Sequence, residues 1–255
     1  MLEARKVSKP AAAAPAWPSS LYAKPRVQPS WEPSTSPSPS PYVRTPAAMG
    51  GTLVAEEMME GVRQAIQTLG VKGLTTLGVT SSLRGEGRTT LALATALVLA
   101  EYGMETILLE LDLAHPELCH RLGVSKYPGL LDVAEGRADV ADAMHPFSPG
   151  VSIVPVGQMQ GSIPRALSQL AKSELLSELA SQGVAVVADL PPLMGNSAGR
   201  QAASLMADLI LVVRANMVPA ATIVEAVAGL PVTPKVLLNG TRSRVPGWVR
   251  RLSGI

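Results

Sequence analysis

The stretch Ser81-Ser82-Leu83-Arg84-Gly85-Glu86-Gly87-Arg88-Thr89-Thr90 decides the fold, because it has the composition and surroundings of a phosphate-binding loop. It follows an apolar run, residues 74–79, and precedes a helical pattern, residues 90–99. Strand, glycine-rich loop and helix in this order are the context that makes such a motif credible. Glycines let backbone N–H groups turn inward, and the following helix adds the positive end of its dipole. The stretch therefore predicts a site for a polyphosphate.

This loop departs from the usual form G-x-x-x-x-G-K-[ST] at its first glycine and at its lysine. Ser82 stands at the first glycine and Gly87 at the second. Arg88 takes the place of the lysine, and Thr89 that of the hydroxyl residue on magnesium. The candidate cofactor-binding residues are Ser82, Arg84, Gly85, Glu86, Gly87, Arg88, Thr89 and Thr90.

The pattern beyond the loop alternates strands and helices, and the strands are continuous apolar runs. Such runs indicate burial on both faces, which favours a doubly wound α/β fold with a mostly parallel sheet. A dinucleotide-binding fold is a weaker alternative, because Thr90 stands where its third glycine would be. The expected strands are residues 74–79, 106–111, 151–156, 184–189, 209–213 and 235–238, and the expected helices are residues 55–69, 89–102, 129–135, 164–179, 199–206 and 219–228.

Composition divides the chain into a proline-rich arm, residues 1–50, and a globular domain, residues 51–255. The arm holds ten of the 22 prolines, so we expect it to be disordered or polyproline-like. No apolar run reaches the roughly 18 residues of a membrane span, and the start of the chain lacks a secretory h-region. The single cysteine, Cys119, excludes a disulfide framework within one chain. These features predict a cytoplasmic protein.

Three carboxylates follow two of the expected strands. Glu110 and Asp112 are two residues apart at the end of one apolar run, and Asp189 ends another. A carboxylate after several buried apolar residues is costly unless it has a partner such as hydrated Mg²⁺. Either motif alone is commonly only a turn or a helix cap. Both together with the loop favour a site for phosphate and Mg²⁺.

Several motifs carry a family resemblance. They are Arg84–Thr90, against P-G-E-G-K-S-T; Leu108–Pro116, against L-L-V-D-A-D-L-R-R-P; and Asp189-Leu190-Pro191-Pro192, against D-T-P-P. From about Glu56 to Arg251 the chain resembles the cytoplasmic domain of bacterial tyrosine kinases of capsule and exopolysaccharide synthesis. These kinases lie within the deviant Walker ATPases, which include the Min and Par proteins.

The resemblance implies a P-loop domain that binds ATP or ADP with Mg²⁺. It implies that Arg88 holds phosphates, that Thr89, Asp112 and Asp189 serve the metal, and that Glu110 is the candidate base. It also implies a membrane co-polymerase or chain-length protein as partner at the inner face of the membrane, and it allows a homo-oligomer. No nucleic-acid partner is expected, because the body of the chain between its basic ends is acidic.

Departures from the family pattern keep two alternatives open. Arg88 replaces the lysine, the terminal tyrosine cluster is absent, and the helical E-x-x-R-x-x-R motif is found as Glu57-x-x-Glu60-x-x-Arg63. The first alternative is a catalytically inactive pseudo-kinase with a structural or regulatory role. The second is a Min/Par-like positioning ATPase, against which Leu83 counts because those proteins have a lysine there.

Overall fold

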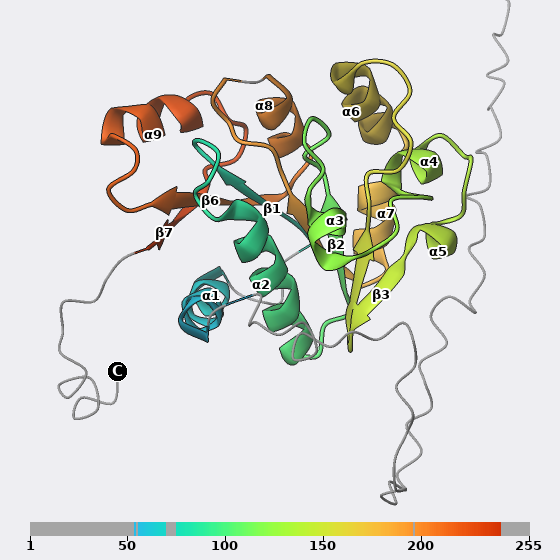
Figure 1. Ribbon diagram of the computed structural model, residues 1–255, viewed down its shortest axis with the longest axis horizontal. Helices are drawn as coiled ribbons and strands as arrows, with labels where there is room; N and C mark the ends of the chain where they lie inside the picture. The colour runs from blue at the N-terminus through green and yellow to red at the C-terminus, as the bar shows by residue number, and fades with distance from the viewer. Residues whose placement is uncertain (1–53, 55, 70–74, 196, 241–255) are drawn as a thin grey trace, which may run out of the picture. The chain divides into compact units, whose positions relative to one another are not determined.

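The computed structural model describes residue 54 and residues 56–69, 75–195 and 197–240 (Figure 1). The arm at residues 1–50 and the basic C-terminal segment with Arg242, Arg244, Arg250 and Arg251 lie outside this part. The strands are β1 (Thr76–Ser81), β2 (Thr106–Glu110), β3 (His145–Ser148), β4 (Val151–Val154), β5 (Ala185–Asp189), β6 (Asp208–Arg214) and β7 (Lys235–Asn239). The helices are α1 (Glu56–Leu69), α2 (Arg88–Glu101), α3 (Leu118–Leu122), α4 (Leu130–Ala134), α5 (Val140–Ala143), α6 (Ile163–Lys172), α7 (Leu175–Ser181), α8 (Ser197–Ala203) and α9 (Ala220–Val227).

In the described residues, seven strands form one sheet in the order β3-β4-β2-β5-β1-β6-β7. Every neighbouring pair is parallel except β3 with β4. The register aligns Val79 and Glu110 with Asp189, so the carboxyl ends of β1, β2 and β5 meet at one edge. The mostly parallel α/β fold predicted from the sequence is confirmed.

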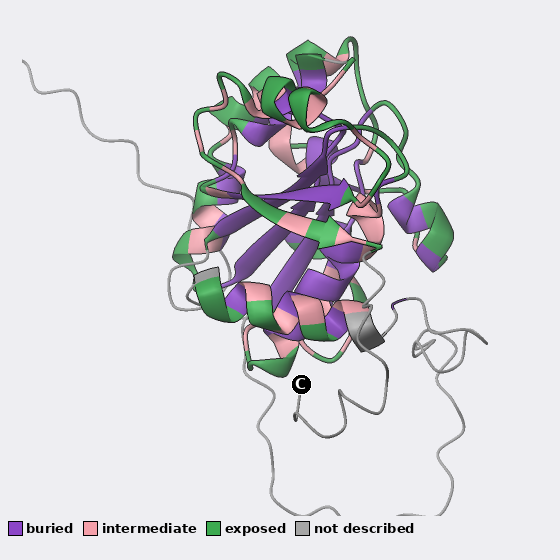
Figure 2. Cartoon of the chain, turned by 90° about the vertical axis from the view of Figure 1, so that its left-hand side faces the viewer, coloured by how far each residue is buried: buried purple, intermediate pink, exposed green. Residues whose placement is uncertain are grey.

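Side chains alternate between two core layers, and β1 shows this clearly. Leu77 and Val79 belong to the core beneath α1 and α2. Gly78 points to the opposite face, where an added Cβ would lie 2.6 Å from Leu190 and 2.7 Å from Met206. That face is covered by α7 and α8, which both contact β1. Figure 2 shows the buried strands between the two layers.

Only the ends of the sheet are less covered. The edge strand β7 leaves Val236 and Leu238 more than half exposed, whereas Leu237 packs on the core.

Among the helices of the described residues, none is long and apolar enough to cross a membrane.

The structure changes the expected elements in four places. The six expected strands are present with small shifts, but β3 was not predicted. The helix expected at residues 164–179 is two helices, α6 and α7, separated at Ser173 and Glu174. Glu174 has φ 56°, a left-handed conformation that interrupts the helix. The short helices α3 and α5 were also missed.

Candidate functional site

The glycine-rich loop connects β1 to α2 and depends on two left-handed glycines. Gly85 has φ 83° and Gly87 has φ 99°, conformations that residues with a side chain rarely adopt. A Cβ on Gly87 would also collide with the Asn239 side chain. Gly87 is the N-cap of α2 and supplies no side-chain cap, so the first N–H groups of this helix remain available to a ligand. The loop therefore has the backbone form of an anion cradle.

Glu86 stabilises this loop through hydrogen bonds of its side chain and its backbone carbonyl. Its side chain is buried, and its carboxylate accepts hydrogen bonds from the N–H of Leu83 at 2.7 Å and of Arg214 at 3.1 Å. The Asn239 amide donates to the Glu86 carbonyl at 2.8 Å. Glu86 was predicted to bind the cofactor, but its carboxylate does not line the cavity. It fixes the loop that does.

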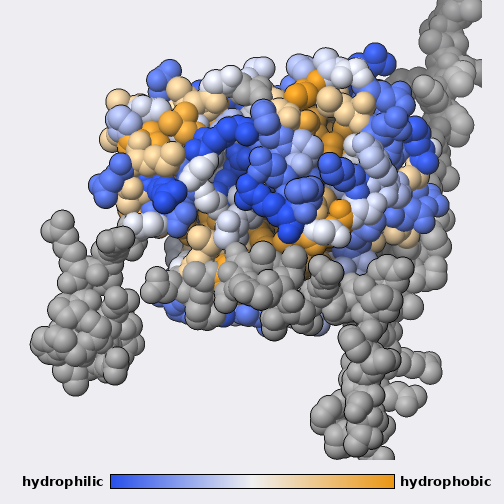
Figure 3. All heavy atoms as spheres, viewed as in Figure 1, coloured by the Kyte–Doolittle hydropathy of each residue, from blue (hydrophilic) through white to orange (hydrophobic). Residues whose placement is uncertain are grey.

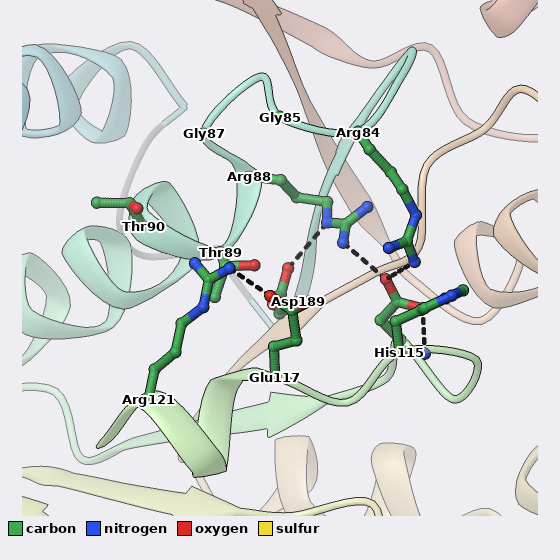
Figure 4. Close-up of a pocket in the computed structure, with 11 residues that line it drawn as sticks. Arg84, Gly85, Gly87, Arg88, Thr89, Thr90, His115, Glu117, Arg121 and Asp189 are labelled. Carbon is green, nitrogen blue, oxygen red and sulfur yellow. Dashed lines mark hydrogen bonds and ion pairs between the residues drawn. The ribbon is translucent and has the colours of Figure 1, made fainter. Parts of the chain in front are cut away.

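Arg88 lies between the two aspartates. Its Nη2 donates to Asp112 Oδ2 at 2.7 Å, and its Nε donates to Asp189 Oδ1 at 3.2 Å (Figure 4). Arg84 adds a second, longer ion pair to Asp112 at 3.6 Å. The Arg88 side chain is 12% exposed, and the aspartates 4% and 3%. The sequence predicted all three residues at one site, and the structure brings them together.

These side chains line a cavity of about 320 Å³ at the carboxyl edge of the sheet. Figure 3 shows hydrophilic residues gathered over this part of the molecule. His115, Glu117 and Arg121 complete the wall, and the last two form an ion pair. Neither Glu117 nor Arg121 was predicted, because no sequence motif marks a charged pair on a helix as short as α3. The predicted residues that line the cavity are Arg84, Gly85, Gly87, Arg88, Thr89, Thr90, Asp112 and Asp189.

Glu110 lies elsewhere, contrary to its expected role. Its Oε1 accepts the N–H of Leu118 at 2.6 Å and of Cys119 at 3.4 Å, so it caps the start of α3. Burial raises the pKa of Glu110, and the Cys119 thiol and the N–H groups only partly oppose this. Glu110 does not line the cavity, so its geometry suits a structural cap and not a base acting there. Glu110 is the last residue of β2 and Asp112 lies beyond the strand, so a spacing of two residues does not bring both carboxylates to the cavity.

Ser82 also stands back from the cavity. It is buried, and its hydroxyl has no hydrogen-bond partner among the described residues. Arg88 Nη1 is buried and likewise makes no hydrogen bond within that part of the chain. A buried guanidinium donor is costly to leave unpaired. Because Arg88 lines the cavity, a small shift of its guanidinium would let a phosphate oxygen there accept from this donor.

Burial governs the charge of Asp189. It raises the pKa of Asp189 to about 6, because removal from water outweighs the lowering by Arg88 and Thr89. The nearby charge of Asp112 raises it further. The Arg88 guanidinium, which bonds both Asp189 and Asp112, is the main counter-charge of Asp189.

The loop fits a nucleotide phosphate, but the aspartates do not fit Mg²⁺ in this arrangement. Mg²⁺ requires near-octahedral oxygen ligands at close range. Here Arg88 takes one oxygen of Asp112 and one of Asp189, and its positive charge would repel the ion. No group of three or more His, Cys, Asp or Glu residues suited to a metal was found in the described ranges.

Comparisons with known proteins support the fold. No family model matches the chain. An uncharacterized ATP-binding protein of Methanocaldococcus jannaschii is 32% identical over 104 residues, which are 40% of this chain and 38% of that protein. The match thus spans well under half the length of that relative.

Solved kinase domains resemble the whole described domain. The VpsO kinase domain has 26% identity and a TM-score of 0.64, over 73% of this chain and 97% of that one. The kinase domain of Escherichia coli ETK has 20% identity and a TM-score of 0.63, over 74% and 77%. MinD of Aquifex aeolicus, in complex with MinC, has 19% identity and a TM-score of 0.54, over 70% and 72%. The predicted resemblance to bacterial tyrosine kinases and related P-loop ATPases is confirmed.

Proposed function

We propose that this chain binds ATP or ADP through its phosphates at the loop of residues 82–90. The observation that carries this proposal is that Arg88 lines the cavity at the N-terminus of α2 while its buried Nη1 makes no hydrogen bond within the described residues. The α2 dipole and its free N–H groups add favourable interactions with an anion. Similarity to an ATP-binding protein supports the nucleotide over a simple phosphate.

Titration calorimetry of Gly87→Val against wild type tests nucleotide binding. A side chain at Gly87 would meet Asn239 and fill the phosphate cradle, so we expect the variant to lose binding of ATP and ADP. Gly103→Val is the matched control, because Gly103 also has positive φ, 81°, and has open space around it. Equal nucleotide affinity in wild type and a folded Gly87→Val protein would exclude the loop as the site.

The wider role that we propose is a tyrosine-kinase-like subunit of an exopolysaccharide or capsule assembly system. It would work at the inner face of the membrane beneath a membrane co-polymerase or chain-length protein. The likeness to the VpsO kinase domain supports the kinase-like part. The predicted basic C-terminal segment, residues 240–255, supports contact with an anionic surface.

A pseudo-kinase is the second candidate, and the Arg88 geometry favours it. Transfer of a phosphoryl group depends on charge placed at the transferred group. In this chain the loop cation is bonded to Asp112 and Asp189 instead. We therefore propose that any phosphotransfer is slow, with nucleotide binding as the main activity of the site.

A further inference from the structure

We infer that the Arg88 guanidinium takes the place of a divalent cation, so that this site binds the metal-free form of a nucleoside di- or triphosphate. This inference rests on the proposed nucleotide binding and specifies its ligand. Asp112 and Asp189 form a carboxylate pair of the kind that usually binds a metal. In this structure both carboxylates bond Arg88 instead.

The first step is the geometry of Arg88. A divalent ion in such a site would join protein carboxylates to phosphate oxygens. Arg88 already has that arrangement: Nη2 and Nε bond Asp112 and Asp189, and Nη1 has no protein partner in the described residues. The planar fork can hold both carboxylates and still donate to a phosphate, which a lysine ammonium cannot do with the same geometry.

The second step is charge. The carboxylates of Asp112 and Asp189 both pair with Arg88, and Asp112 also lies 3.6 Å from Arg84. A divalent ion between the same carboxylates would add two positive charges beside a guanidinium that cannot lose its proton. To admit the ion, Arg88 must leave a position where it is only 12% exposed. The metal and Arg88 therefore compete for the same oxygens.

The third step is the charge of the ligand. A metal-free polyphosphate carries more negative charge than its magnesium complex, so it needs more cations around it. Arg121 also lines the cavity but is paired with Glu117. Arg84, which is about half exposed and only loosely paired with Asp112, is therefore the cation that can turn toward a ligand. The free N–H groups of α2 add a positive partial charge. Arg84, the unpaired Nη1 of Arg88 and these N–H groups are the positive groups that would meet the free anion of ATP or ADP.

Calorimetric titration of the full-length protein with ADP and ATP, in EDTA and in millimolar MgCl₂, tests the inference. We expect the wild type to bind in EDTA at least as tightly as in Mg²⁺. Arg88→Lys should behave oppositely and lose about tenfold or more of its affinity when Mg²⁺ is removed. Arg165→Lys, the same change at an exposed residue outside this cavity, should behave as wild type.

Electron paramagnetic resonance with Mn²⁺ gives a readout that does not depend on activity. With ADP present, wild type should leave Mn²⁺ no more bound than ADP alone, whereas Arg88→Lys should immobilise it. Tight wild-type binding only with Mg²⁺, or Mn²⁺ held by the wild-type complex, would overturn the inference but leave nucleotide binding intact. Absence of binding in both buffers would instead overturn the proposed function.

Discussion

Arg88 differs from lysine in shape more than in charge, and the difference decides what the site can do. The guanidinium reaches Asp112 and Asp189 at once, while an ammonium group on a flexible stem acts as a point charge. In this chain the loop cation is therefore tied to the protein. A lysine in the usual phosphate-binding loop instead serves the β- and γ-phosphates.

Replacing Arg88 with lysine should release the aspartates and return a point charge to the phosphates. We expect Arg88→Lys to raise Mg²⁺-dependent phosphotransfer by about tenfold or more from a very low wild-type level. Transfer of labelled phosphate from ATP measures this, with Arg165→Lys as control. If neither the variants nor the wild type transfer phosphate, weak kinase activity is excluded and the result supports the pseudo-kinase alternative.

Asp189 predicts a pH dependence of stability. Burial raises its pKa from 3.8 to about 6, so the folded state favours the protonated form. Stability from this group is fully present below pH 3.8 and is lost as the pH rises through about 6. We expect Asp189→Asn, which mimics the protonated form, to unfold at a higher temperature than wild type at neutral pH. The gap in thermal midpoint should shrink toward pH 4; a gap independent of pH would contradict this assignment.

At the scale of elements, Asp132 ties α4 to the loop after β4. Its Oδ2 accepts the N–H of Gly129 and of Gln158, both at 3.0 Å, and its Oδ1 accepts Arg137 Nη2 at 2.8 Å. Burial opposes ionisation, but Gln158, Arg137 and Gly129 outweigh it and hold the pKa of Asp132 below its usual value. Stability from this group is therefore present above the ordinary pKa of 3.8 and is lost as the pH falls through the lower folded value.

Asp132→Asn should lower the free energy of unfolding by about 2–3 kcal/mol at neutral pH, since the amide cannot accept all these bonds. Asp142→Asn, at an exposed aspartate of α5, should change it by less than about 0.5 kcal/mol. Denaturant unfolding of both variants measures the difference. Equal midpoints would show that the Asp132 contacts contribute little to stability.

Helices and strands whose apolar residues recur in a regular pattern could be predicted from the sequence. Elements that depend on contacts with residues distant in the sequence could not. The five central strands lie between helices, so their apolar runs were readable. The break between α6 and α7 leaves the helical repeat of leucines intact, so only the left-handed Glu174 reveals it. The short helix α3 depends on its cap from Glu110, a contact made across a turn.

The same distinction holds for the site. Gly85, Gly87, Arg88, Asp112 and Asp189 were predictable, because strand ends and a glycine loop converge in a parallel sheet. The role of Glu86 was not, because its partners Arg214 and Asn239 lie on β6 and β7, far along the chain. The carboxylate oxygens that Arg88 contacts likewise could not be predicted, because they depend on how the β1–α2 loop packs against the ends of β2 and β5.

Helix α1 bears on assembly of the whole molecule. The E-x-x-R-x-x-R motif of the kinases that this chain resembles has an arginine where this chain has Glu60, and here Arg63 donates to Glu60 at 3.3 Å and to Glu101 of α2 at 3.1 Å. These contacts within one chain hold α1 on the domain. They give Arg63 a structural role besides any part in a homo-oligomer, which remains a proposal.

At the scale of the whole chain, the prediction with the widest consequence is recruitment to the membrane. Arg242, Arg244, Arg250 and Arg251 follow the described domain in a segment without acidic residues. At about 1 kcal/mol for each basic residue near an anionic surface, four arginines give only modest, salt-sensitive attraction. A protein contact must then supply specificity, which is why we propose a membrane co-polymerase or chain-length protein as partner.

Changing these four arginines to glutamine should reduce the membrane-bound fraction, because it removes the electrostatic part of the attraction. Thermal unfolding and nucleotide titration should stay unchanged, because the loop and aspartates lie within residues 82–189 and are untouched. Fractionation of cells that co-express the neighbouring membrane components measures the effect, and raised salt should lower the bound fraction of the wild type more than that of the variant. A wild-type protein that stays wholly in the soluble fraction under these conditions would refute docking, and a free cytosolic nucleotide-binding protein would take its place.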